Sequence, residues 1–132
     1  MNKLILNCIA LLFFSLFISI NNHSFSQCNN GTNFYPSALQ TPPLGTWWSA
    51  TSFNYAGEII RVDVNAGDVY EFSTCSNYGG VSATYDTQLT LTDVSGNVLA
   101  FNDDYTGCGT NSYFSWPATF SGEVYLHINE YN

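Results

Sequence analysis

The sequence predicts an all-β protein, an antiparallel β-sandwich preceded by a signal peptide. Apolar and polar residues alternate in short runs, and Gly, Asn, Asp and Ser separate these runs about every ten residues. No stretch shows a sustained helical period. Aromatic residues make up 17% of the chain, which provides enough apolar surface for a core although only 9% of the residues are charged.

Residues 1–26 are expected to be the signal peptide. Lys3 precedes a long apolar run, and the polar stretch that follows places Ser24 and Ser26 at the small positions before a cleavage site. We expect cleavage between Ser26 and Gln27, and a mature chain that is secreted to the extracellular space or the cell surface. An uncleaved membrane anchor is the alternative, but at about 17 residues the run is barely long enough to span a bilayer.

The mature chain is strongly acidic. Removal of the leader leaves Arg61 as the single Lys or Arg against ten acidic side chains, a side-chain charge of −9. Nucleic acid and anionic membrane surfaces are excluded as partners because both require a basic patch. We also expect no membrane insertion after cleavage of the leader. Divalent cations and neutral partners such as glycans are compatible with this charge.

Three cysteines remain after cleavage. Cys75 ends one strand-like run and Cys108 lies in the loop after another, so we expect a disulfide between them, which would stabilise by roughly 3–4 kcal/mol. Cys28 is then left without a partner. Since the sequence also stops at the end of a strand pattern with no tail, we expect a fragment truncated at its C-terminal end, with the partner of Cys28 beyond Asn132. A complete protein with one free or intermolecular thiol is the alternative.

The N-terminal half of the mature chain divides into a lead-in and the first strands. Residues 27–45 contain three prolines and are expected to be irregular, and residues 46–132 form the predicted sandwich module. A first short strand is predicted at 46–52. Residues 57–64 and 68–75 both alternate and are joined by a Gly-containing turn, which predicts a β-hairpin.

The C-terminal half also contains alternating runs separated by turns. Residues 87–93 and 98–103 flank the turn "VSGN" and predict a second hairpin, and residues 112–119 and 123–129 are the last two predicted strands. Alternation assigns the following residues to the inward faces: Ile60, Val62, Val64, Tyr70, Phe72, Leu89, Leu91, Phe114, Trp116, Val124, Leu126 and Ile128.

Oxygen-bearing side chains gather in and after the second hairpin. They are Asp86, Asp93, Asn102, Asp103 and Asp104. Calcium takes six to eight oxygen ligands from such groups, and Asp86 and Asp103 or Asp104 would lie at the ends of neighbouring strands, where they could converge at one rim. The alternative is that these residues only end strands and form Asx-type turns. The sequence leaves both interpretations open.

No catalytic constellation is visible, so we expect a protein that is not an enzyme. A pair of glycosidase carboxylates needs a cleft for which a domain of this size has little room, and neither GxSxG nor HExxH is present. His127 is the only histidine after the leader, and alternation places it outward, where we expect a solvated or rim residue and not a general base.

Adjacent aromatic residues offer a second candidate site. Trp47 and Trp48 would point to opposite faces of a strand, so one of them could be exposed. Together with Tyr55, Tyr78 or Tyr105, an exposed indole could stack on a sugar or pack on a partner. The alternative is that the proline-rich lead-in covers it.

Three segments, "VDVNAGDVYEFSTC", "YDTQLTLTDVSGNVLAFNDD" and "SWPATFSGEVYLHI", resemble the bacterial pre-peptidase C-terminal (PPC) domain family over roughly residues 45–132. The cysteine-bearing form is similar to modules in large secreted proteins of Bacteroidetes-type bacteria. The resemblance implies a jelly-roll-like sandwich that accompanies secreted peptidases and other exported enzymes. Some of its relatives bind calcium, and some bind insoluble polymers. This module follows directly on a signal peptide, whereas modules of the family follow a catalytic domain.

We therefore expect a non-catalytic accessory or binding module of a secreted or cell-surface bacterial protein, with calcium as the one candidate cofactor. Its expected partners are downstream domains of the same polypeptide and an extracellular polymer or glycan. The alternatives are an N-terminal fragment of a secreted peptidase or other hydrolase, and a glycan- or polymer-binding module.

Overall fold

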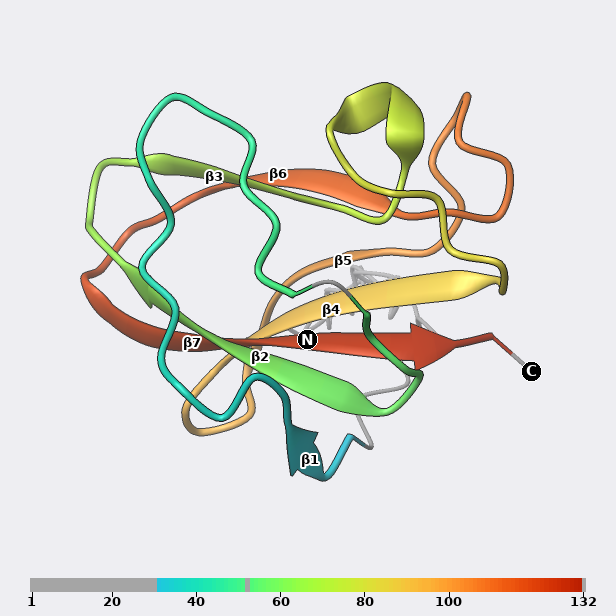
Figure 1. Cartoon of the computed structure of the whole chain (residues 1–132). Helices are drawn as coiled ribbons and strands as arrows, with labels where there is room; N and C mark the ends of the chain where they lie inside the picture. The colour runs from blue at the N-terminus through green and yellow to red at the C-terminus, as the bar shows by residue number, and fades with distance from the viewer. Residues whose placement is uncertain (1–30, 52, 132) are drawn as a thin grey trace, which may run out of the picture.

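The computed structural model describes residues 31–51 and 53–131, which form seven strands and one short 3-10 turn. The predicted signal peptide and Cys28 lie outside these residues. In chain order the elements are β1 Asn33–Phe34, β2 Glu58–Val64, β3 Val69–Ser73, η1 Ser76–Tyr78, β4 Thr87–Asp93, β5 Val98–Asn102, β6 Tyr113–Pro117 and β7 Gly122–Glu130 (Figure 1). The described part of the chain contains no helix long and apolar enough to cross a membrane.

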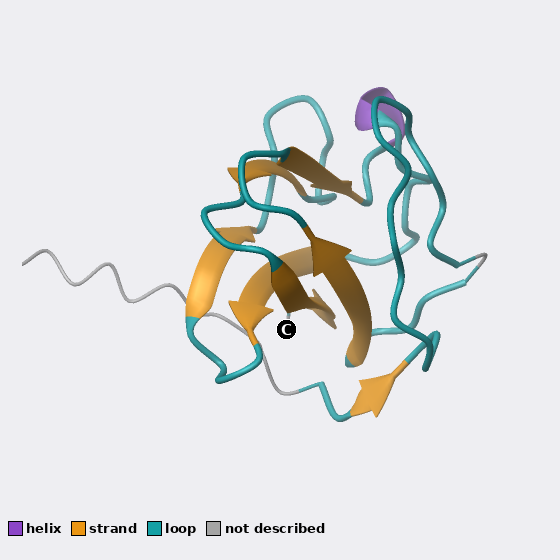
Figure 2. Ribbon diagram, turned by 90° about the vertical axis from the view of Figure 1, so that its left-hand side faces the viewer, coloured by secondary structure: helices purple, strands orange, loops and turns teal. Residues whose placement is uncertain are grey.

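The strands form two sheets that face each other. One sheet has five strands in the order β1-β2-β7-β4-β5, and the other consists of β3 and β6. Figure 2 shows the smaller sheet lying across from the larger one. Every pairing is antiparallel except that of β1 with β2. The prediction of an all-β, sandwich-like protein is therefore confirmed.

Alternating apolar residues build the core between the sheets. Val62 of β2 stands opposite Val124 of β7, and Leu126 of β7 stands opposite Leu91 of β4, so their side chains meet on the inner face of the large sheet. Each is buried, and complete burial of such a side chain contributes about 1.5–3 kcal/mol. All twelve residues that the alternation assigned to the inside belong to this core cluster.

The small sheet closes the core with aromatic rings. Tyr70 pairs with Trp116 and Phe72 with Phe114 across β3 and β6, with ring centroids 6.4 Å and 5.4 Å apart. Such pairs contribute beyond the area that they bury. Two strands are enough to cover the centre of the large sheet because these side chains are large.

The predicted hairpin of β2 and β3 is wrong. β2 pairs with β1 and β7, whereas β3 pairs with β6 in the opposite sheet. The turn around Gly67 passes the chain between layers, and the Gly67 amide donates to the Ala118 carbonyl at 2.8 Å. Strands that face each other across a core show the same alternation as strands that pair side by side, so the pattern could not separate the two arrangements.

The lead-in also differs from its prediction. Residues 46–51 form no strand, whereas Asn33–Phe34 pairs in parallel with β2. Gln40 continues this edge, since its amide donates to the Arg61 carbonyl at 2.9 Å and its own carbonyl accepts from Asp63 at 2.8 Å. Part of the segment that was expected to be irregular therefore extends the large sheet.

Candidate functional site

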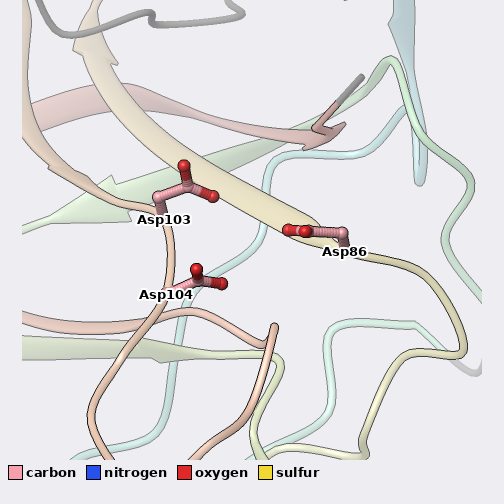
Figure 3. Close-up of side chains that lie close together, drawn as sticks. All are labelled: Asp86, Asp103 and Asp104. Atoms are coloured by element: carbon pink, nitrogen blue, oxygen red, sulfur yellow. The ribbon is translucent and has the colours of Figure 1, made fainter.

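Three of the five predicted oxygen ligands come together at one end of the sandwich. Asp86 precedes β4, and Asp103 and Asp104 follow β5, and their carboxylates point toward one another (Figure 3). One oxygen from each lies within 4.8 Å of the others. They converge because β4 and β5 are antiparallel neighbours, so the start of one strand lies beside the end of the other.

A buried serine fixes the main chain on both sides of this site. The Ser112 hydroxyl lies within hydrogen-bond distance of the carbonyl oxygens of Thr87 and Asp103. Its amide is shared between the hydroxyls of Thr74 at 3.0 Å and Thr87 at 3.1 Å. Ser112 thus holds the start of β4 and the loop after β5 in register. This role of Ser112 could not be predicted from the sequence, because serine is common next to turns.

The site concentrates negative charge in a partly desolvated place. Among the described residues, Oδ1 of Asp86 and Oδ1 of Asp103 are buried with no hydrogen-bond partner, while the other oxygen of Asp103 accepts from Gln88 Nε2 at 3.1 Å. Burial raises the pKa of Asp86, and the charges of Asp104, Asp103 and Glu130 raise it further. Two buried acceptors without donors favour either a proton or a cation at this position.

No basic side chain of the described chain serves this site. Arg61, the one arginine, pairs with Glu123, with Nη2 and Oε2 3.0 Å apart, and this ion pair lowers the pKa of Glu123. Hard oxygen donors without a neighbouring Lys or Arg suit Ca²⁺, which would complete its coordination with main-chain carbonyls or water. The three carboxylates therefore fit a calcium ion chemically.

The side chains of the other two predicted ligands have hydrogen-bond partners outside the three carboxylates. Asp93 lies at the opposite end of β4, where its Oδ1 accepts from the amides of Ser95 at 2.8 Å and Asn97 at 2.9 Å. These bonds and the Asn97 side chain lower the pKa of Asp93. Asn102 Oδ1 accepts from the Tyr113 amide at 3.1 Å. The Asx-turn interpretation holds for Asp93, whereas Asn102 joins β5 to β6.

The predicted disulfide between Cys75 and Cys108 is present, with a sequence separation of 33. It ties the start of η1 to the loop that follows Asp104. Around it lie the tyrosine rings of residues 78, 105 and 113, which contact one another. Tyr78 and Tyr105 were singled out from the sequence, whereas Tyr113 was missed because its alternation only indicated a strand.

Both predicted stacking residues are partly exposed. Trp47 is 45% exposed and Trp48 is 42% exposed, and neither belongs to the core. The two indoles differ in their surroundings, because Trp47 lies directly against Gly79 at the end of η1. The strand that was expected to send them to opposite faces does not form.

The prediction that His127 is solvated is wrong. It points away from the core, as its alternation indicated, but it is only 7% exposed, and its Nε2 lies 3.1 Å from the Thr92 hydroxyl. Desolvation lowers the pKa of His127. It lies beside the middle of β4, because Thr90 is its partner in register, whereas the three aspartates lie at the end of that strand.

Comparison with known proteins gives a family but no activity. The chain matches no curated protein and no solved structure. The resemblance to the PPC family stays a prediction. A family model described as a domain of unknown function, DUF8695, matches residues 49–132. Because this match covers more than half of the 132 residues, the chain belongs to the DUF8695 family.

Proposed function

We propose that this chain is a non-catalytic β-sandwich module of an exported protein and that it binds Ca²⁺ through Asp86, Asp103 and Asp104. One observation carries the calcium proposal. Three carboxylate oxygens lie within 4.8 Å of one another, and the described chain supplies no hydrogen-bond donor for the buried Oδ1 atoms of Asp86 and Asp103.

The proposed ion has a structural role. It would join the residue before β4 to the loop after β5, and that loop is also tied to η1 by the disulfide of Cys108. Calcium bound to the folded state alone stabilises it by mass action, by about 2.7 kcal/mol at a concentration a hundredfold above its Kd. The expected extracellular location is compatible with this choice, because weak extracellular calcium modules work at 10⁻⁴–10⁻³ M calcium.

The accessory role rests on the sequence. The chain has the pattern of an exported protein, has no visible catalytic constellation and resembles the PPC family. Its partners are then further domains of the same polypeptide. A downstream catalytic domain would make this chain the N-terminal part of a secreted peptidase or other hydrolase.

The test is thermal unfolding of the processed protein, secreted with its own leader. It is measured in about 5 mM calcium, which exceeds the affinities of extracellular calcium modules, and in excess chelator. We expect calcium to raise the Tm by roughly 10 °C at saturation. Asp86→Asn, Asp103→Asn and Asp104→Asn should each reduce this shift strongly.

Asp63→Asn is the matched control, because it removes the same charge at the opposite end of β2 and β7, where Asp63 pairs in register with Glu123. It should keep the full calcium shift. Equal Tm values with calcium and chelator in the unmodified protein, together with no heat of binding in calorimetry, would refute the calcium site.

A further inference from the structure

Three tyrosine rings meet at the end of the sandwich that carries η1, and the indole of Trp47 lies against Gly79 next to one of them. We call Trp47, Tyr78, Tyr105 and Tyr113 the aromatic rim. The ring centroids of the three tyrosines lie 4.7 Å, 4.8 Å and 5.1 Å apart, so each ring contacts both others. Trp47 joins them through Gly79, the residue after Tyr78, against which its indole lies.

Several contacts hold the segments of the rim in place. The disulfide of Cys75 and Cys108 links the η1 segment to the loop that carries Tyr105. Asn77 Nδ2 donates to the Gly107 carbonyl at 2.9 Å and links the same two segments. The Tyr113 hydroxyl donates to Glu71 at 2.6 Å, which fixes one end of that ring. A surface ordered in this way loses little conformational entropy when it binds.

Gly79 shows that the position of Trp47 is specific. It adopts a φ of +76°, and a Cβ on Gly79 would lie only 2.0 Å from Cδ2 of the indole. A side chain at this position would displace the tryptophan. Because glycine has no Cβ, Gly79 allows the indole of Trp47 to lie against the main chain.

The rim does not serve the core. None of its four residues belongs to the core cluster, which lies between the sheets. Trp47 is 45% exposed and Tyr78 is 37% exposed, whereas Tyr105 and Tyr113 are half-buried beside Tyr78. Ordered and partly exposed aromatic rings outside the core favour a binding surface.

Charge selects the chemistry of the ligand. The described chain has one arginine, and it is engaged by Glu123, whereas Asp104, directly before Tyr105, and Glu71, bonded to Tyr113, add negative charge beside the rings. Anionic polymers are repelled by this surface. Neutral sugars are not repelled, and the C–H groups on a pyranose face pack against the electron-rich faces of aromatic rings while their hydroxyls bond to polar neighbours.

We propose that the aromatic rim binds a neutral polysaccharide by stacking sugar rings on Trp47 and the tyrosines. The proposal rests on the proposed function only in treating the chain as a binding module, and it does not require calcium. Trp47 is assigned to the rim because its indole lies against Gly79, the residue after Tyr78.

The test is affinity gel electrophoresis of the processed protein in gels containing mixed-linkage β-glucan, arabinoxylan or galactomannan, with polygalacturonate as the anionic comparison. We expect retardation by at least one neutral polymer and none by polygalacturonate. Trp47→Ala and Tyr78→Ala should each weaken retention at least tenfold, whereas Trp47→Phe, which keeps a ring, should retain part of it. Tyr55→Ala is the matched control, since Tyr55 is 73% exposed and outside the rim.

The outcomes separate this proposal from the calcium site. Retention that persists in chelator and in Asp86→Asn supports the rim whether or not calcium binds. No retardation by any of the three neutral polymers overturns the proposal, as does an effect of Trp47→Ala and Tyr78→Ala no larger than that of Tyr55→Ala. Retardation by polygalacturonate as strong as by the neutral polymers would also overturn it. The Tm of each variant identifies those that fail to fold. If Trp47→Ala fails to fold, the retention of Trp47→Phe decides the result.

Discussion

Two aspartates at the two ends of one strand show how local contacts decide the role of a residue. Asp93 accepts hydrogen bonds from the Asn97 side chain and from two main-chain amides, which stabilise its charged form and lower its pKa. Asp86 has a buried oxygen without a donor and faces other carboxylates, which raises its pKa. The sequence offered both as ligands, because the residue type is the same and only the fold shows which oxygens remain available.

The first prediction concerns the pH dependence that Asp86 confers. Its pKa in the folded protein lies above the ordinary value of 3.8. Its contribution to stability is therefore fully present below that value and is lost as the pH rises through the raised pKa. In chelator, we expect the unmodified protein to lose stability relative to Asp86→Asn as the pH rises from about 4 to 7.

Calcium should reverse this trend. The ion binds the deprotonated carboxylate and competes with the proton, so its stabilising effect grows with pH. Urea unfolding at several pH values, with calcium and with chelator, measures both effects. Parallel pH curves for the unmodified protein and Asp86→Asn under both conditions would contradict the prediction.

The second prediction concerns the contact between Gly79 and Trp47. Gly79→Ala should lower the free energy of unfolding by about 1–3 kcal/mol, because Ala is strained at positive φ and its Cβ meets the indole. The tryptophan emission should also shift to longer wavelength as Trp47 becomes more exposed. Gly57→Ala is the control, since Gly57 has a φ of +87° but open space at its Cβ. An equal loss of stability in both variants, without an emission shift, would show that the indole contact contributes nothing.

Among the elements, those with strong alternation and a clear turn were predictable. β4 and β5 were predicted as a hairpin around "VSGN", and their antiparallel pairing confirms it. β1 was not predictable, because two residues carry no period, and their pairing depends on the exposed edge of β2. A strand was predicted at 46–52, but residues 46–51 pair with no strand, and Trp47 lies against Gly79.

The third prediction concerns the link between η1 and the loop after β5. Replacing Cys75 and Cys108 together by Ser should lower the free energy of unfolding by roughly 3–4 kcal/mol, from the loop closed by a sequence separation of 33. Urea unfolding in a Cys28→Ser background measures this without rearranged disulfides. Amide exchange should accelerate in residues 103–112 more than in β7. A double variant as stable as its parent would mean that the other contacts alone hold the loop.

At the scale of the whole molecule, the sequence predicted five candidate ligands but not which of them come together. Chain order placed Asp86 and Asp103 at neighbouring strand ends, and the β4–β5 hairpin brought them together. The hydrogen bond that Asn102 Oδ1 accepts from the Tyr113 amide could not be predicted, because that amide comes from a strand more distant in sequence. Recognising Ser112 required the meeting of three segments. Contacts between distant segments are what alternation and turn patterns cannot supply.

The last prediction separates a specific ion from general screening. A chain with ten acidic side chains repels itself, so salt should stabilise it whatever the local geometry. Raising NaCl from about 0.02 to 0.15 M in chelator shortens the screening length to roughly 8 Å and should stabilise the unmodified protein and Asp103→Asn alike. Calcium at about 1 mM adds little ionic strength, yet it should raise the Tm of the unmodified protein far more than that of Asp103→Asn, because it needs the converging carboxylates.

Magnesium at the same concentration provides the sharper comparison. It has the same charge, but it demands short, octahedral coordination and gives up water reluctantly, so we expect a smaller shift in Tm than with calcium. If magnesium or NaCl of matched ionic strength reproduced the calcium shift, or if Asp103→Asn retained it in full, the stabilisation would come from the acidity of the whole molecule. A shift confined to calcium and to proteins with Asp86, Asp103 and Asp104 intact would instead assign it to one ion held where β4 begins and β5 ends.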